Sequence, residues 1–386
     1  MTRAWYIAHL TNFLSMCCHM SATLLSLYWK ENGFEDWEIG WMAASFSSAA
    51  ILSRWGLGKG MERWGRRPFL VAGAAMLHFP PLAYPFMGDR FELWILARLI
   101  QGFGLGIYIT AILTWVADIS PPEKIGQMQG VFGVSGLLGA AAGPFAFEKI
   151  YLNFGFQHMF HWLFATGVAC WMLACTLPET RVKQDELPQS VSPELRVGDH
   201  LATVVVSIPF GWVVGTIISF IAPFTKTLHM EKVGLYFSGF AVASVAVRVF
   251  AGPLIDKLSI NSLVVGSGSM MAGCSLAIGS LVYAPSPGLL LLAATFNGIG
   301  HGFLFPGLSS YIVKRSEPRK RGAGLALFTA SFDGGILLGG LCSGYISQGY
   351  GYPTAFIASA LLMLCSLPAF VVINRRKLAQ ESQVNR

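Results

Sequence analysis

The decisive stretch of this sequence is Gly58-Lys59-Gly60-Met61-Glu62-Arg63-Trp64-Gly65-Arg66-Arg67. It is short, rich in glycine and mostly basic, and it lies between two long apolar segments. Glycine supplies the backbone freedom that a tight turn requires. A cluster of Lys and Arg between apolar spans is typical of the cytoplasmic side of a membrane. The stretch therefore predicts a tight cytoplasmic loop between two membrane-spanning helices.

The composition is that of a polytopic membrane protein. Of the 386 residues 54% are hydrophobic and only 12% are charged, whereas an average soluble domain is about 25% charged. Apolar stretches of about 20 residues, each long enough to cross a hydrocarbon core of about 30 Å, recur from end to end. Backbone groups must pair internally within a bilayer, so we predict an all-α integral membrane protein with twelve transmembrane helices. The predicted spans are 4–28, 37–58, 67–88, 92–116, 126–147, 158–177, 201–225, 234–255, 260–283, 287–313, 323–346 and 353–373.

The distribution of positive charge predicts the orientation in the membrane. With the N-terminus inside, nineteen Lys and Arg fall in cytoplasmic segments, five in outer loops and three, Arg54, Arg98 and Arg248, within spans. This bias follows the positive-inside rule, so we expect both termini to be cytoplasmic and the protein to lie in a bacterial inner membrane. The net charge of +7 is then an orientation signal and not a sign of nucleic-acid binding. The same basic segments could also contact anionic lipid head groups.

The chain contains an internal repeat. A shift of 196 residues places Gln101-Gly102-Phe103-Gly104-Leu105-Gly106 on Asn297-Gly298-Ile299-Gly300-His301-Gly302. Many secondary transporters consist of two such halves, with the substrate site at their interface near the bilayer midplane. We therefore predict two pseudo-symmetric six-helix halves, residues 1–178 and 201–386, joined by a polar cytoplasmic linker at 179–200.

Three motifs resemble signatures of the major facilitator superfamily. The opening stretch reads G-x-x-x-[DE]-R-x-G-R-R, like the loop between helices 2 and 3 of that family, with Glu62 where Asp is usual. Arg98-Leu99-Ile100-Gln101-Gly102-Phe103-Gly104 resembles the helix 4 signature R-x-x-Q-G-x-G. Gly139-Ala140-Ala141-Ala142-Gly143-Pro144 resembles the first part of the helix 5 signature G-x-x-x-G-P, which is associated with antiporters. Phe147-Glu148 stands where that signature continues with two glycines. The resemblance extends over essentially the whole chain and implies the twelve-helix fold of that family.

The resemblance assigns a gating role to the opening stretch. In the family this loop forms charge pairs and helix-end contacts that hold the outward-facing state closed on the inside. A carboxylate there can meet a helix N-terminus or an arginine. The alternative is that its arginines only anchor the topology. The predicted gating residues are Gly58, Glu62, Arg63, Gly65, Arg66 and Arg67, with Asp256 and Lys257 as the counterpart in the second half.

Small residues in the motifs predict close helix packing. Glycine lets helix backbones approach, which in lipid replaces the hydrophobic drive for association. Such surfaces serve packing alone or also provide an interface that slides during transport. We further expect a bend at Pro144, which has no N–H and crowds the preceding turn. The residues assigned to packing and bending are Gly102, Gly104, Gly139, Gly143 and Pro144.

Two charged residues within spans are candidates for proton coupling. Asp333 is the acidic residue near the centre of a predicted span, and Arg98 lies about 9 Å from the middle of its own span. Charges at membrane depth are costly and mark functional sites by default. By the resemblance, the arginine is associated with proton transfer in exporters. For each residue the alternative is a structural pairing with a neighbouring helix.

Polar and aromatic stripes predict the lining of a substrate cavity. His9, Asn12 and His19 share one face of the first span, and Asn297 and His301 stack on the tenth. By the resemblance, helices 1, 4, 7 and 10 surround the central cavity. The alternative for the histidines is interhelical packing, which we also expect for His78. The predicted cavity residues are His9, Asn12, His19, Gln101, Tyr108, Trp212, Asn297 and His301.

No motif for catalysis, nucleotide binding or metal binding is present in the sequence, so we expect no enzyme activity and no cofactor. We predict a monomeric secondary active transporter that works by alternating access, with proton-coupled export of a small organic molecule as the first hypothesis. Uptake of a sugar, an organic acid or a siderophore-like chelate is the alternative. A membrane receptor or scaffold that transports nothing is the alternative of another class.

Overall fold

The computed structural model describes residues 3–54, 57–121, 125–180, 200–230, 233–250, 258–315 and 321–384, and every regular element in these ranges is helical. The chain forms two compact units. The first unit is Met1–Gln189 with Glu231–Ala241, and the second is Ser190–Met230 with Val242–Arg386. The predicted halves, residues 1–178 and 201–386, stay a prediction. Asp256 and Lys257 lie outside the described residues.

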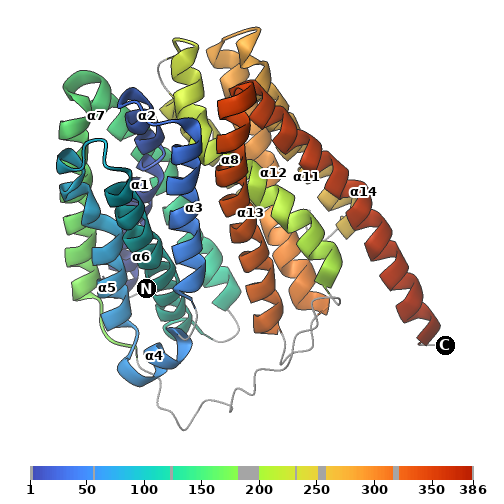
Figure 1. The fold of residues 1–386 in the computed structure, drawn as a ribbon. Coiled ribbons are helices and arrows are strands. Elements are labelled where there is room, and N and C mark those ends of the chain that lie inside the picture. Colours follow the sequence, from blue (N-terminus) through green and yellow to red (C-terminus); the bar gives the residue numbers. More distant parts are fainter. Residues whose placement is uncertain are drawn as a thin grey trace. The chain divides into compact units, whose positions relative to one another are not determined.

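The helices of the first unit follow the predicted spans in order (Figure 1). They are α1 (Arg3–Ser21), α2 (Leu24–Glu31), α3 (Asp36–Leu52), α4 (Leu57–Trp64), α5 (Arg67–His78), the short 3₁₀ turns η1 (Pro80–Leu82) and η2 (Tyr84–Phe86), α6 (Phe91–Asp118) and α7 (Ile125–Thr176).

The helices of the second unit also follow the predicted spans in order. Its helices are α8 (Leu201–Thr227), α9 (Gly234–Phe250, which is shared between the units), α11 (Ile260–Gly279) with η6 (Ser280–Val282), α12 (Pro287–Arg315), α13 (Arg321–Tyr350) and α14 (Tyr352–Val384). Eight helical segments of the described residues are long and apolar enough to cross a membrane.

The helix α7 contains two predicted spans. The backbone is helical through Pro144. It leaves the helical region at Gly155 (φ 81°, ψ 173°), where the chain reverses. The reversal therefore needs the one residue type that adopts a positive φ without strain. The third span ends in η1 and η2 because Pro80, Pro81 and Pro85 interrupt the backbone hydrogen bonding of a longer helix.

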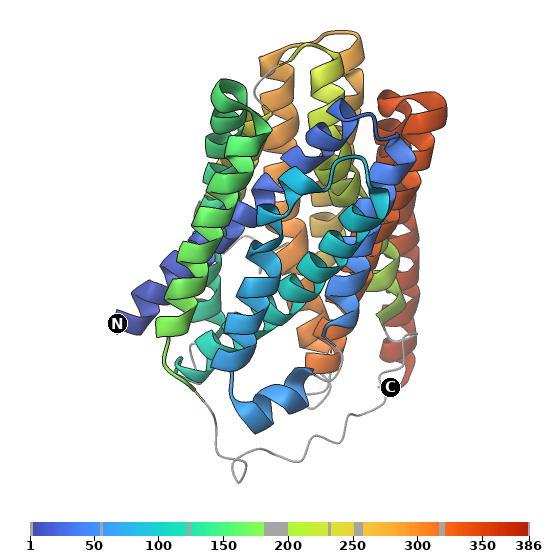
Figure 2. The same cartoon turned by 60° about the vertical axis from the view of Figure 1, so that its left-hand side comes forward.

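The opening stretch is more ordered than the predicted loop. Leu57–Trp64 forms α4, which lies across the end of the first unit's helices (Figures 1 and 2). Leu57 and Met61, four residues apart, are both buried in the core of that unit, while Glu62 is exposed. This amphipathic spacing favours a helix. The tight turn comes after α4, at Gly65, where φ is +90°.

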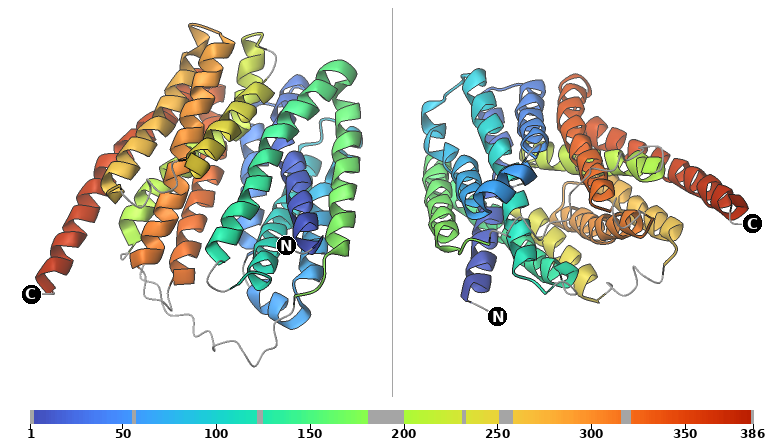
Figure 3. Two further views of the ribbon diagram at one scale, coloured as in Figure 1. Left: turned by 180° about the vertical axis from the view of Figure 1, so that it is seen from behind. Right: turned by 90° about the horizontal axis from the view of Figure 1, so that it is seen from below.

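In the first unit, α1 lies between the two arms of α7 (Figure 3, left). On the first arm, a Cβ at Gly139 or Gly143 would collide with the α1 backbone at Phe13 or Cys17. On the second arm, the Leu163 carbonyl accepts a hydrogen bond from the Cys18 thiol at 3.6 Å. The glycines predicted to pack therefore bring α1 and α7 to backbone contact.

The second unit repeats this contact between α8 and α13. A Cβ at Gly335 would collide with the Ile208 carbonyl of α8, and one at Gly339 with that of Trp212. Gly335 and Gly339 stand 196 residues after Gly139 and Gly143, the shift that relates the two halves. The internal repeat thus extends to the closest helix contacts within each unit.

The glycine ridge of α6 packs on two helices. A Cβ at Gly102 would meet the Phe46 carbonyl of α3, and one at Gly104 would meet the backbone of α5 at Leu77. On α12, Gly300 occupies the corresponding place against Met271 of α11. Close approach without side chains is what small residues provide in membrane helices. The packing role predicted for Gly102 and Gly104 agrees with these contacts.

Candidate functional site

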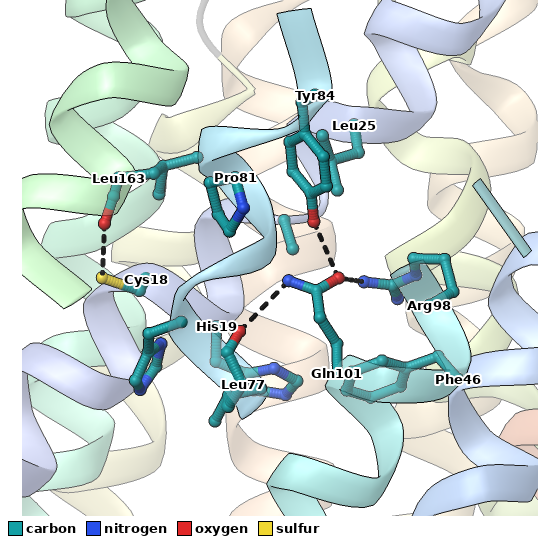
Figure 4. A pocket seen from close by; sticks show the side chains of 12 residues that line it. Cys18, His19, Leu25, Phe46, Leu77, Pro81, Tyr84, Arg98, Gln101 and Leu163 are labelled. Carbon is teal, nitrogen blue, oxygen red and sulfur yellow. Dashed lines mark hydrogen bonds between the residues drawn. The ribbon is translucent and has the colours of Figure 1, made fainter. Parts of the chain in front are cut away.

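A small cavity lies inside the first unit, between α1, α3, α5, α6 and α7 (Figure 4). Its volume is about 20 Å³, which is room for one particle of the size of a water molecule. Arg98 and Gln101 line it from α6, His19 from α1 and Phe46 from α3. Arg98, Gln101 and His19 therefore bring polar side chains from two helices to one cavity.

Arg98 is buried in this cavity wall, with 8% of its surface exposed. Its Nη1 donates to Gln101 Oε1 at 3.0 Å, and its Cζ lies 4.2 Å from the ring centroid of Phe46 and 5.9 Å from that of Trp29. Its Nε is buried without a hydrogen-bond partner. Cation–π contacts of desolvated arginines contribute about 2 kcal/mol each. The guanidinium is thus held by aromatic rings and an amide, and it has no carboxylate partner within the described part of the chain.

Gln101 connects the cavity to two further elements. Tyr84 of η2 donates from its hydroxyl to Gln101 Oε1 at 2.7 Å, and Gln101 Nε2 donates to the Leu77 carbonyl of α5 at 3.2 Å. The amide oxygen therefore accepts from both Arg98 and Tyr84. Sequence reasoning missed Tyr84, because it follows a proline-rich turn and belongs to no periodic pattern.

Two histidines complete the cavity wall. The ring of His19 stacks on Phe46 with 5.4 Å between centroids and an interplanar angle of 19°. His78 Nε2 lies 3.0 Å from the Ser15 hydroxyl, and its ring meets the buried ring of Tyr108 edge-on. The packing expected for His78 agrees with these contacts, and the residue also lines the cavity.

The predicted stripe on α1 divides between two environments. His9 packs against Trp5 and Phe132, with ring centroids 4.6 and 5.3 Å apart. Asn12 is buried and donates from Nδ2 to the Ser135 hydroxyl of α7 at 3.0 Å. His9 and Asn12 therefore contact α7, and His19 is the member of the stripe that lines the small cavity. The assignment of these residues to a substrate cavity stays a prediction.

In the second unit, aromatic rings surround the predicted histidine of α12. His301 lies 5.3 Å from Phe210, 5.8 Å from Phe305 and 6.3 Å from Phe332, between ring centroids. Asn297, one turn before it, is buried, and Trp212 of α8 is half-buried.

Asp333 is half-buried on α13. It directly follows Phe332, whose ring contacts both Phe210 and His301. The predicted coupling carboxyl therefore belongs to the helix that packs tightly on α8. Its coupling role stays a prediction, as does that of Arg98.

A second polar cluster lies at the start of α5; we call it the α5 cluster and define it as Arg66, Asp118, Glu179 and Thr180. Arg66 Nε donates to Asp118 Oδ2 at 2.8 Å. The Glu179 carboxylate accepts from the backbone N–H groups of Arg66 at 2.7 Å and Arg67 at 3.2 Å. A carboxylate at a helix N-terminus is stabilised by the unpaired N–H groups and the helix dipole.

The α5 cluster refines the gating hypothesis. The contacts that we expected Glu62 to make are of the kind that two other carboxylates make: Asp118 pairs with Arg66, and Glu179 binds the N-terminus of α5. Glu62 and Arg63 are exposed, and Arg63 lies over Trp64 with 5.4 Å from Cζ to the ring centroid. A Cβ at Gly65 would collide with the Glu179 carboxylate, so the close approach requires glycine. The gating roles of Glu62 and Arg63 stay predictions.

Glu148, the departure from the helix 5 signature, is buried near the end of the first arm of α7. Its Oε2 accepts from the Gly234 N–H at the start of α9, at 2.8 Å. Residues 231–241 belong to the same unit as α7, so this contact is internal to it. The signature has a glycine at this position, which offers no side chain for a contact. Here the Glu148 carboxylate takes its place and binds the N-terminus of α9.

Comparison with known proteins identifies the family. The family model described as the major facilitator superfamily matches residues 6–285 and 201–385. The chain belongs to the major facilitator superfamily. Members of this family are membrane transporters, so the protein is a multi-pass transporter and not an enzyme. The predicted membership of the superfamily is thereby confirmed.

Two curated relatives of this superfamily chain match it over nearly its whole length. An uncharacterized MFS-type transporter of Salmonella typhimurium is 24% identical over 364 residues, which cover 91% of this chain and 90% of that protein. One of Methanocaldococcus jannaschii is 19% identical over 372 residues, covering 93% and 95%.

Solved structures confirm the fold of the superfamily. A mutant of the nucleoside transporter NupG superposes with a TM-score of 0.82 at 17% identity, covering 96% of this chain and all of that one. A POT family transporter in complex with 5-aminolevulinic acid gives a TM-score of 0.78 at 12% identity, covering 97% of each chain. At these identities the likeness concerns the fold alone.

Proposed function

We propose that this transporter works by alternating access and couples the export of a small organic molecule to the entry of protons. The observation that carries the proposal is the repeated glycine contact within each unit. Gly143 meets α1, and Gly339 meets α8. Transporters built from repeats alternate access largely by moving one repeat against the other as rigid bodies. Backbone-tight packing within each repeat supplies the rigidity that such motion requires.

Export is favoured by the helix 5 sequence. Gly139, Gly143 and Pro144 form the motif that resembles the antiporter signature, and the two glycines are the residues that contact α1. An antiporter exchanges its substrate for an ion moving in the opposite direction. We therefore propose a proton antiporter of a bacterial inner membrane, monomeric, with both termini in the cytoplasm.

Proton coupling is favoured by charged and titratable side chains at membrane depth. Asp333 is half-buried on α13, and Arg98 is buried on α6. A coupling carboxyl must load and release a proton as water gains and loses access to it. Asp333 is the residue that we assign to this step, with His301 and His19 as the next candidates.

Uptake is the second candidate, and one observation favours it. Glu148 replaces the second part of the antiporter signature and binds the N-terminus of α9. This contact is not a feature of the glycine-rich signature, so the direction of transport need not follow that signature. The substrate would then be a sugar, an organic acid or a siderophore-like chelate.

The test compares metabolites released by cells that overproduce the wild-type protein or Asp333→Asn. A compound enriched in the medium only with the wild-type protein is then loaded into proteoliposomes, and a proton gradient of either direction is imposed. Export by antiport predicts substrate efflux when the outside is acidic, and no acceleration when the gradient is reversed. If the compound instead moves in the same direction as the protons, the transporter is a symporter, and uptake is established. Binding without flux under both gradients would favour a receptor.

A further inference from the structure

We propose that the cavity beside Arg98 holds a small monovalent anion of halide size, such as chloride. The cavity is the one described above, lined by residues of the first unit (Figure 4). This inference goes beyond the proposed transport function, because it assigns the cavity a resident ion and not the transported molecule.

The first argument is charge. Arg98 is more than nine-tenths buried, and among the residues that the structure describes it forms no ion pair. Charged side chains at membrane depth normally pair with one another or with backbone carbonyls. Gln101 supplies a neutral amide oxygen and Phe46 a ring face, and neither carries a formal negative charge. A positive charge in this position favours an anionic partner.

The second argument is the supply of hydrogen-bond donors. Arg98 Nε is buried without a partner. The Gln101 amide has two N–H donors, of which one reaches the Leu77 carbonyl. Gln101 Oε1, the oxygen nearest to the guanidinium in Figure 4, already accepts from Arg98 and Tyr84. Arg98 Nε and the second Gln101 N–H therefore remain available as hydrogen-bond donors, which an anion site requires.

The third argument is size. A cavity of about 20 Å³ admits a single water-sized particle. A monatomic ion is closer to this size than a carboxylate with an organic substituent. A water molecule would also fit, but it would leave the guanidinium without a counter-charge.

The test measures thermal unfolding of the purified protein in detergent at constant ionic strength, with sodium gluconate replaced stepwise by sodium chloride or bromide. We expect Tm to rise saturably by about 2–5 °C with either halide, because a ligand that binds only the folded state stabilises it. Sodium sulfate stabilises folded proteins generally, so any rise that it causes should not saturate and should be the same in Arg98→Gln. Arg98→Gln should lose the halide response, and Arg90→Gln, which removes an exposed arginine, should keep it.

A second variant keeps the proposal testable if Arg98→Gln does not fold. Gln101→Glu places a carboxylate from the chain itself beside Arg98, so its Tm in gluconate should no longer rise with halide. Crystals grown in bromide should show an anomalous peak at the Arg98 guanidinium. The proposal would be overturned if the wild-type protein showed no halide-specific rise in Tm. It would also be overturned if Gln101→Glu kept the full rise, or if bromide peaks appeared only away from Arg98.

Discussion

Arg66 forms an ion pair with Asp118, with 2.8 Å between Nε and Oδ2, and the two side chains are only 7% and 13% exposed. Thr180 donates a hydrogen bond to the same Asp118 oxygen at 2.9 Å. Glu179, the residue before Thr180, binds the N-terminus of α5. The α5 cluster therefore ties the turn before α5 to the end of α6 and to the segment after α7.

Asp118→Asn should destabilise the protein by about 2–4 kcal/mol, because removing one partner of a largely buried pair leaves the Arg66 charge uncompensated. Thermal unfolding in detergent measures the change. The matched control is Glu62→Gln, which alters an exposed carboxylate on the neighbouring helix α4 and should change Tm little. Equal stability of the two variants would show that the ion pair contributes nothing to the folded state.

Glu62→Gln tests the gating hypothesis by transport. If Glu62, with Arg63 and Arg67, holds the inside closed, the variant should transport more slowly while it expresses and folds normally. Cysteines introduced into the predicted cavity should then react faster with reagents added from the inside. Wild-type flux in this variant would leave these residues with a topological role only.

Gly335→Ala should lower the thermal stability of the protein, and Gly334→Ala should not. A Cβ at Gly335 meets the backbone of α8, whereas at Gly334 it meets open space. Overpacking costs about 1–3 kcal/mol, while alanine stabilises a helix interior by about 1 kcal/mol relative to glycine. Tm should therefore fall for Gly335→Ala and stay level or rise for Gly334→Ala. Indistinguishable melting curves would contradict the close α8–α13 contact.

Asp333→Asn should abolish gradient-driven transport in proteoliposomes and preserve substrate binding and downhill exchange. Arg98→Lys should damage coupling less than Arg98→Ala, because lysine keeps the charge but loses the planar group that contacts Phe46 and Gln101. If Asp333→Asn still pumps uphill with the wild-type dependence on protons, Asp333 is structural.

The predicted orientation can be tested by labelling single cysteines in intact cells, in a variant without native cysteines. A cysteine at position 33, exposed in the loop between α2 and α3, should react with an impermeant reagent. Cysteines at position 190 and at the exposed position 376 of α14 should be spared. The reverse pattern would overturn the positive-inside assignment.

The sequence by itself determined the membrane fold, the family and the repeat. Long apolar stretches leave helices as the way to satisfy the backbone in lipid. The shift of 196 residues that aligns Gly104 with Gly300 also aligns Gly143 with Gly339, and both pairs lie at close helix contacts. Sequence periodicity is local or repeats along the chain, so these features could be inferred without coordinates.

Only the tertiary structure decided which polar groups meet. Asp118 and Glu179, distant in sequence, bind the turn before α5, where the sequence pointed to Glu62. Tyr84 and Gln101 join Arg98 through a hydrogen-bond network that connects η2 with α6. One-dimensional patterns state which face of a helix a side chain occupies, but not which helix packs on that face. For this reason the charged partners of Arg66, and the lack of an ion pair at Arg98 among the described residues, became evident only when the helices were assembled.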